Sequence, residues 1–170
     1  MNAVEKFLAV SDRLLAWFLI FVMASMVVGV TWQVVSRFML SSPSSFTEEL
    51  ARFQLIWIGL LGAAYAFRRG AHLGLDLLTA NMPIQAKLRT AMVANALAFV
   101  FAATVMVYGG WQLVTLILSL GQLSAALQVK MGYVYSVIPL SGILICIYAL
   151  VNIKQSMDGI DITIKDESDD

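Results

Sequence analysis

The chain has 170 residues, of which 60% are hydrophobic and only 13% are charged. A soluble domain carries about 25% charged residues, so this composition excludes most soluble folds and favours a bundle of membrane helices. Lys and Arg together number 11, as do Asp and Glu, so no basic excess points to nucleic acid. One Cys and one His can supply neither a disulfide framework nor a zinc or iron–sulfur site.

The first long run without charge extends from Leu14 to Ser36 and is rich in Leu, Val, Met, Phe and Trp. About 20 apolar residues in a helix cross the hydrocarbon of a bilayer, so this run predicts a span over 14–36. A cleaved signal peptide is the alternative, but its apolar core would be shorter, about 7–15 residues. Glu5 and Asp12 also offset the basic residues that a signal peptide would carry. We therefore expect an uncleaved first span.

The second span needs a charged end to reach the required length. The uncharged run Phe53–Phe67 would be only about 22 Å long as a helix, which is too short to cross alone. Starting the helix at Phe46 makes it long enough, and Ser45 with Glu48 three residues later resembles a capping box. The sequence therefore predicts a span over 46–67.

Two further spans follow in the second half of the chain. No charge occurs from Thr90 to Val129, about twice what one crossing uses, so we place a span over 91–117. The apolar segment Leu118–Val129 then lies at the interface or against a partner, or it continues the third helix. The fourth span is predicted over 131–153, with a kink at Pro139. Together these segments predict an all-α integral membrane protein with four transmembrane helices.

The distribution of Lys and Arg predicts which side of the membrane each end faces. Eight of these residues lie on the side of both termini and of the second-to-third connection, and three lie on the other side. Both termini are therefore expected in the cytoplasm. We expect one membrane domain over 1–155 and an acidic, disordered cytoplasmic tail over 156–170. The apolar stretch Leu73–Leu78 predicts a short interfacial helix, with a plain connecting loop as the alternative.

The predicted spans carry no Asp, Glu, Lys or His at mid-depth. Proton-coupled pumps and charged channel filters mark their paths with such residues, and haem-bearing anchors need intramembrane His ligands. No Ser/His/Asp arrangement, phosphate-binding glycine loop or metal-ligand spacing occurs either. We therefore predict no catalytic residue, no metal and no cofactor, and hence no enzyme.

The most distinctive charges lie at the start of the second span. Arg52 follows Glu48 by four residues and Glu49 by three, so either pair can form on one helix face near the membrane surface. One reading is an interfacial anchor that lets a short apolar run span the bilayer. The other is that one carboxylate pairs with another chain, or with Arg37 at the end of the first span. The two roles can coexist.

Small residues follow in the same helix. Gly59 and Gly62 let a neighbouring helix approach closely, either within this chain or from a partner. We expect Trp57 to pack within the helix bundle or to lie at the membrane interface, as aromatic residues of membrane helices commonly do.

Several fragments together resemble the DctQ-like small membrane subunit of the tripartite ATP-independent periplasmic (TRAP) transporters. The resemblance covers about residues 1–155. It rests on Phe46-Thr47-Glu48-Glu49-Leu50-Ala51-Arg52, Trp57, Gly59-Leu60-Leu61-Gly62-Ala63-Ala64, Arg68-Arg69-Gly70-Ala71-His72, Gly121-Gln122-Leu123-Ser124-Ala125-Ala126-Leu127 and Tyr135-Ser136-Val137-Ile138-Pro139-Leu140.

This resemblance implies a partnership in the bacterial inner membrane. A large subunit with the substrate and sodium sites would move an organic acid, such as a C4-dicarboxylate or sialic acid, by an elevator-like motion. A periplasmic binding protein would deliver the solute transiently. The small subunit would be the obligate partner of the large one, serving as a static scaffold and helping to dock the binding protein.

The resemblance also implies roles for the charged and small residues. Candidates for the partner interface are Arg37, Glu48, Glu49, Arg52, Trp57, Gly59 and Gly62. Phospholipid head groups are expected near Arg68, Arg69 and His72. Charge reversal at Glu48 or Glu49 is expected to reduce uptake without stopping membrane insertion.

Two other classes of protein stay open. One is a stand-alone four-helix membrane protein, such as a small exporter or an assembly factor. The other is a membrane anchor for a redox enzyme, which would carry haem or flavin. Co-purification of a larger membrane protein separates the first from a transporter subunit, and a visible absorption spectrum tests the second.

Overall fold

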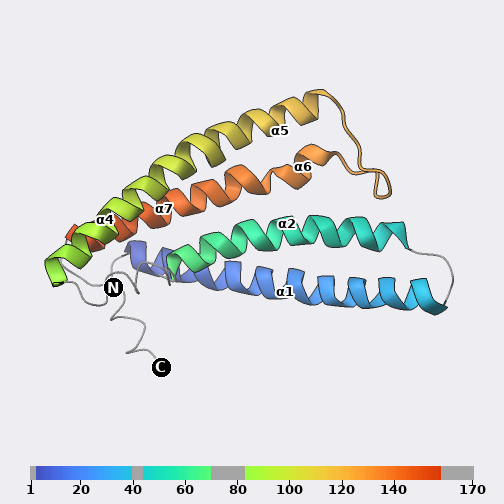
Figure 1. The fold of residues 1–170 in the computed structure, drawn as a ribbon, viewed down its shortest axis with the longest axis horizontal. Helices are drawn as coiled ribbons and strands as arrows, with labels where there is room; N and C mark the ends of the chain where they lie inside the picture. The colour runs from blue at the N-terminus through green and yellow to red at the C-terminus, as the bar shows by residue number, and fades with distance from the viewer. Residues whose placement is uncertain (1–2, 40–43, 70–82, 158–170) are drawn as a thin grey trace. The chain divides into compact units, whose positions relative to one another are not determined.

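A computed structural model describes residues 3–39, 44–69 and 83–157, and all its regular elements are helices (Figure 1). Within these ranges the only β-type pairing is an isolated bridge between Leu123 and Lys130. In the described part of the chain, four helical stretches are long and apolar enough to cross a membrane: Leu8–Met39, Ser45–Arg68, Gln85–Ser119 and Met131–Met157. The predicted all-α membrane fold with four spanning helices is confirmed.

Each predicted span lies inside one of these stretches. The elements in chain order are α1 (Ala3–Met39), α2 (Ser45–Arg68), α4 (Ile84–Phe101), the π-helix η1 (Ala102–Gly109), α5 (Gly110–Ser119), α6 (Met131–Tyr135) and α7 (Val137–Met157). The elements α4, η1 and α5 follow one another without a break and form the third spanning helix. The predicted interfacial helix around Leu73–Leu78 lies outside the described residues, and so does nearly all of the predicted acidic tail.

The segment after α5, whose structure the sequence leaves open, is a loop. The third helix ends at Ser119, and Gly121 then adopts a left-handed backbone conformation with φ of 63°. A residue with a Cβ rarely adopts this conformation, so glycine allows the chain to turn there. The N–H of Met131 donates to the carbonyl of Gln122 over 2.9 Å and closes the loop, residues 120–130, at its base.

Pro139 explains an interruption in the fourth helix. The helix has a turn at Ser136, between α6 and α7, three residues before the proline. Proline has no N–H, and its ring crowds the carbonyl four residues earlier, here that of Tyr135. The interruption therefore lies about one helical turn before Pro139, and the kink at Pro139 itself stays a prediction.

The chain divides into two compact units, and α2, α5 and α7 contribute residues to both. The first unit comprises residues 1–65 and 113–137, and the second comprises 66–112 and 138–170. In the first unit α1 and α2 lie side by side (Figure 1). Gln54 donates from Nε2 to Ser25 Oγ over 2.7 Å and so joins these two helices. Within the apolar setting of a membrane, such a bond between side chains helps to fix which helices pair.

Close helix packing defines the second unit. A Cβ added at Gly142 of α7 would come within 2.7 Å of Met106 Cβ, and one at Gly110 within 3.1 Å of Pro139 Cδ. Glycine at these two positions therefore allows an approach that a larger residue would prevent. Asn152 also donates from Nδ2 to Asn95 Oδ1 over 3.3 Å, with both residues buried.

Candidate functional site

The first turns of α2 hold a carboxylate pair whose two members have different partners. Glu48 forms an ion pair with Arg52, one helical turn later, and both side chains are exposed. An exposed pair at this spacing contributes only about 0.3–0.5 kcal/mol to stability. Glu48 also lies in the first turn of the helix, where a negative charge interacts favourably with the helix dipole.

Glu49 instead binds the backbone of the loop that follows α5. Its Oε1 accepts the N–H of Ala125 over 3.0 Å, and its Oε2 accepts those of Ala126 and Leu127 over 2.8 and 2.7 Å. Consecutive N–H groups directed at one anion form a binding concavity, and hydrogen bonds to a charged acceptor are stronger than neutral ones. The loop after α5 accordingly returns to the start of α2 (Figure 1).

The loop also makes hydrogen bonds of its own. Ser124 is buried, its N–H donates to the carbonyl of Val129 over 2.9 Å, and its Oγ accepts the N–H of Val129 over 3.2 Å. Gln128 Nε2 donates to the carbonyl of Ala125 over 3.1 Å. We call Glu49 together with residues 124–129 the α2–loop site. It joins a helix start to a turn more than 70 residues away in the chain.

The sequence shows one half of this site but not the other. With two acids, Glu48 and Glu49, and one base, Arg52, the sequence indicates that one carboxylate has to find another partner. It points to another chain or to Arg37 as that partner. The backbone N–H groups of the loop carry no signal in the side-chain pattern. Only the shared resemblance of both fragments to one family hints that they belong together.

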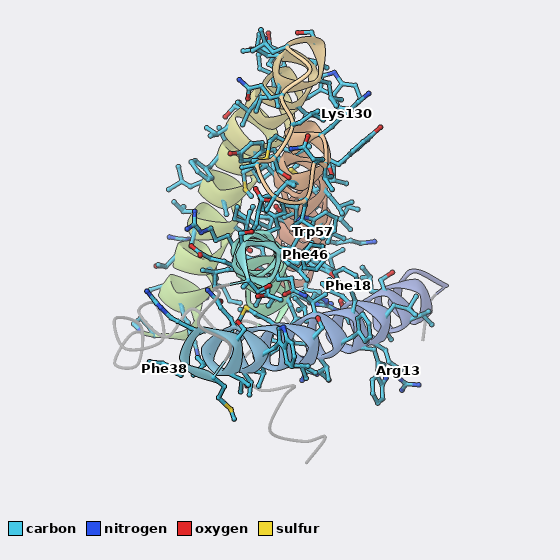
Figure 2. The ribbon with its side chains drawn as sticks, turned by 90° about the vertical axis from the view of Figure 1, so that its right-hand side faces the viewer. Arg13, Phe18, Phe38, Phe46, Trp57 and Lys130 are labelled. Atoms are coloured by element: carbon cyan, nitrogen blue, oxygen red, sulfur yellow. The ribbon has the colours of Figure 1, made fainter. Side chains whose placement is uncertain are left out.

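Trp57 makes its contacts within the first unit. Its Nε1 donates to the carbonyl of Val134 in α6 over 3.1 Å. Its ring packs against that of Phe18 in α1, with centroids 6.1 Å apart and planes inclined by 53°. Figure 2 labels both rings, which come from neighbouring helices. Trp57 thus joins α2 to both α1 and α6.

The remaining interface candidates lie at the surface of the chain or leave free space beside their helix. Arg37 is exposed in the last turn of α1. Gly59 is exposed and Gly62 is half-buried on α2, and an added Cβ at either position would meet nothing within 4 Å. In contrast to Gly142, these two glycines leave a surface that another helix could approach.

The three residues predicted near lipid head groups have different surroundings. Arg68 ends α2, and its guanidinium lies over the ring of buried Tyr148, 5.8 Å from the centroid. Arg69 is exposed in the following turn. His72 lies outside the described residues. In the described part of the chain, no three His, Cys, Asp or Glu side chains come together as a metal site.

Residues 26–159 match the family model described as tripartite ATP-independent periplasmic transporters, DctQ component. The chain belongs to this family. The match begins within α1 and extends past the end of α7, so it includes the whole α2–loop site. With four apolar helices, this DctQ family member is a multi-pass membrane protein.

Several individual proteins with similar sequences are named as TRAP transporter permease proteins. The sialic acid TRAP transporter small permease protein SiaQ of Vibrio cholerae is 30% identical over 87 residues, which are 51% of this chain and 50% of that protein. A putative TRAP transporter small permease protein of Haemophilus influenzae is 36% identical over 62 residues, 36% of this chain and 38% of that protein. The isethionate TRAP transporter permease protein DctMQ of Oleidesulfovibrio alaskensis is 28% identical over 133 residues, 73% of this chain and 20% of that protein. The matches thus span half or less of each relative.

Proposed function

We propose that this DctQ family member is the small permease subunit of a sodium-coupled, binding-protein-dependent TRAP transporter for an organic acid. The observation that carries the proposal is the family match over residues 26–159. Relatives named for sialic acid and for isethionate support an organic anion as the solute, because both compounds are organic anions. Sialic acid and dicarboxylates are the solute types we propose.

The large permease subunit is the proposed obligate partner. A relative named DctMQ, of which this chain matches 20%, supports this pairing. We propose that the small subunit forms a static scaffold, because its spans offer no Asp, Glu, Lys or His at mid-depth for an ion path of their own. The open surface at Gly59 and Gly62 is the proposed contact on α2, since small residues allow close helix approach.

The proposed location is the bacterial inner membrane with both termini in the cytoplasm. The excess of Lys and Arg on the side of the termini supports this orientation. The α2–loop site would then face the periplasm, together with Arg37 and Arg52, and help to dock the binding protein. Arg68, Arg69 and His72 would face cytoplasmic lipid head groups.

Co-purification from mild detergent tests the proposal. The tagged full chain, expressed in its host, should bring down one larger membrane protein in stoichiometric amount. The purified pair in proteoliposomes should take up an organic acid only when the binding protein and a sodium gradient are present. Purification of the chain alone would instead support a stand-alone membrane protein.

A glycine variant tests the proposed contact on α2. Gly59→Leu should reduce recovery of the large subunit several-fold, because the added side chain holds the two helices apart. Gly29→Leu is the matched control, since Gly29 on α1 also has nothing within 4 Å of an added Cβ. Equal recovery with both variants would place the contact elsewhere.

A further inference from the structure

Glu49 offers the loop a bonding pattern that few other side chains could reproduce. An ionised carboxylate has two oxygens and about four lone-pair positions and accepts without donating. Three N–H groups converge on these oxygens, all within 3.0 Å. A glutamine in the same place would direct an NH₂ group at part of this donor set, so an isosteric amide could not satisfy it.

The loop depends on this carboxylate for its order. Within the turn, Ser124 bonds to Val129 and Gln128 bonds to Ala125, and these bonds leave the N–H groups of residues 125–127 to Glu49. Without the carboxylate, these three N–H groups would need water as their partner. Loss of all three charge-assisted bonds would therefore release the turn even with its base intact.

The loop after α5 is suited to contact with water or with a soluble protein. Lipid-exposed irregular backbone does not occur within hydrocarbon, so a turn of this kind must face water or protein. Its exposed side chains include Gln122, Gln128 and Lys130, with Leu123 between them in the sequence. The rim of a protein–protein contact is polar and accessible to solvent, and the two amides and one cation give the loop this character.

We infer that Glu49 is a positioning residue: its carboxylate holds residues 124–127 in the conformation that docks the soluble binding protein. This inference rests on the proposed function and names the residue and the mechanism behind its docking step. Glu49 acts through the loop backbone, and the residues that touch the partner are those exposed on the loop. Glu48 takes no part in this, because it is paired with Arg52.

Amide hydrogen exchange on the full chain in nanodiscs tests the first half of the inference. The variants are Glu49→Gln and, as the matched control, Glu48→Gln, which removes the same charge one residue away. Exchange at residues 125–127 should become at least about tenfold faster in Glu49→Gln and stay unchanged in Glu48→Gln. Unchanged exchange in Glu49→Gln would overturn the inference.

Chemical rescue separates the carboxylate's role from a merely steric one. Glu49→Ala removes the carboxylate and leaves the three N–H groups available to an added anion. Sodium acetate should restore slow exchange at residues 125–127, and sodium chloride at the same ionic strength should restore less. Equal effects of the two salts would show that the loop does not require a carboxylate.

Uptake by the complete transporter tests the second half. In proteoliposomes, Glu49→Gln should raise the concentration of binding protein that gives half-maximal uptake at least fivefold, with the maximal rate within twofold of wild type. Glu48→Gln changes the same charge but frees Arg52 rather than the loop, so it should shift the half-saturating concentration by less than twofold. An unchanged half-saturating concentration in Glu49→Gln would overturn the docking role. If wild-type uptake needs no binding protein, the proposed function fails and the docking role fails with it, whereas the exchange experiment still reports on the loop.

Discussion

Glu49 in the first unit and Asn152 in the second unit both join distant segments of the chain through a polar side chain. Glu49 lies near a helix start and satisfies three backbone N–H groups of an irregular loop. Asn152 is 3% exposed and bonds to Asn95, which is 6% exposed and donates to the carbonyl of Ala91 in its own helix. The first contact satisfies N–H groups of an irregular segment, and the second joins two helices whose backbones are satisfied by their own hydrogen bonds. Their removal should therefore have different consequences.

Charge reversal at Glu49 should have the largest effect. Glu49→Lys places a cation before three N–H donors, so the loop cannot keep its conformation. We expect uptake to fall to about a tenth or less with normal complex yield, a loss of about 1.4 kcal/mol. Initial uptake rates in proteoliposomes measure the change.

Glu48→Lys is the comparison that tests this explanation. It breaks an exposed ion pair with Arg52 and a favourable interaction with the helix dipole, both of them weak at an exposed site, so uptake should fall by less than twofold. The sequence alone predicts a loss for either reversal, and the structure separates the two. Equal losses would show that the charge of the helix start, rather than the loop, matters.

An intermediate effect is expected at Trp57. Trp57→Phe keeps an aromatic ring beside Phe18 but removes the Nε1–H that donates to the carbonyl of Val134. Stability should fall by about 1 kcal/mol, the usual net value of one hydrogen bond. Thermal unfolding of the full chain in detergent measures it. Trp17→Phe, at an exposed tryptophan of α1, is the control, and an equal loss there would contradict the assignment.

The smallest effect is expected at the buried amide pair. Asn152→Leu removes one bond between helices, which in membrane proteins is worth about 0.6 kcal/mol on average. The leucine also removes Asn152 Oδ1, a buried atom with no hydrogen-bond partner in the described residues, and this offsets part of the loss. Unfolding in detergent should therefore change by less than 1 kcal/mol. A loss above about 2 kcal/mol would mean that the pair fixes the helices in place.

The four spanning helices could be predicted because bilayer thickness sets the length of each apolar run. Pro139 could be read as an interruption because proline acts on the helix that contains it. The π-helix Ala102–Gly109 could not be read in this way, since its residues are as apolar as those of α5, which follows it. Local chemistry predicts local structure, and the sequence was informative where the cause lay within a few residues.

The α2–loop site could be predicted only in part. The surplus of acid at Glu48 and Glu49 is visible in the sequence, but the partner of Glu49 is backbone, which every residue except proline offers. The pairing of Asn95 with Asn152 is hidden for a similar reason, because the two amides lie on helices whose register depends on packing. Contacts between distant segments need the fold before they can be assigned.

Only 6% of the most apolar stretch of α1 is buried within the chain, against 39% for the fourth spanning helix. A segment that needs so few neighbours can partition into a bilayer by its own hydrophobicity, before the rest of the chain has folded around it. Because so little of α1 is buried within the chain, most of its surface must contact lipid or another subunit. The side chains of α1 would then contact mainly lipids or other subunits. A change in lipid composition or in the partner subunit should therefore affect α1 before the other helices.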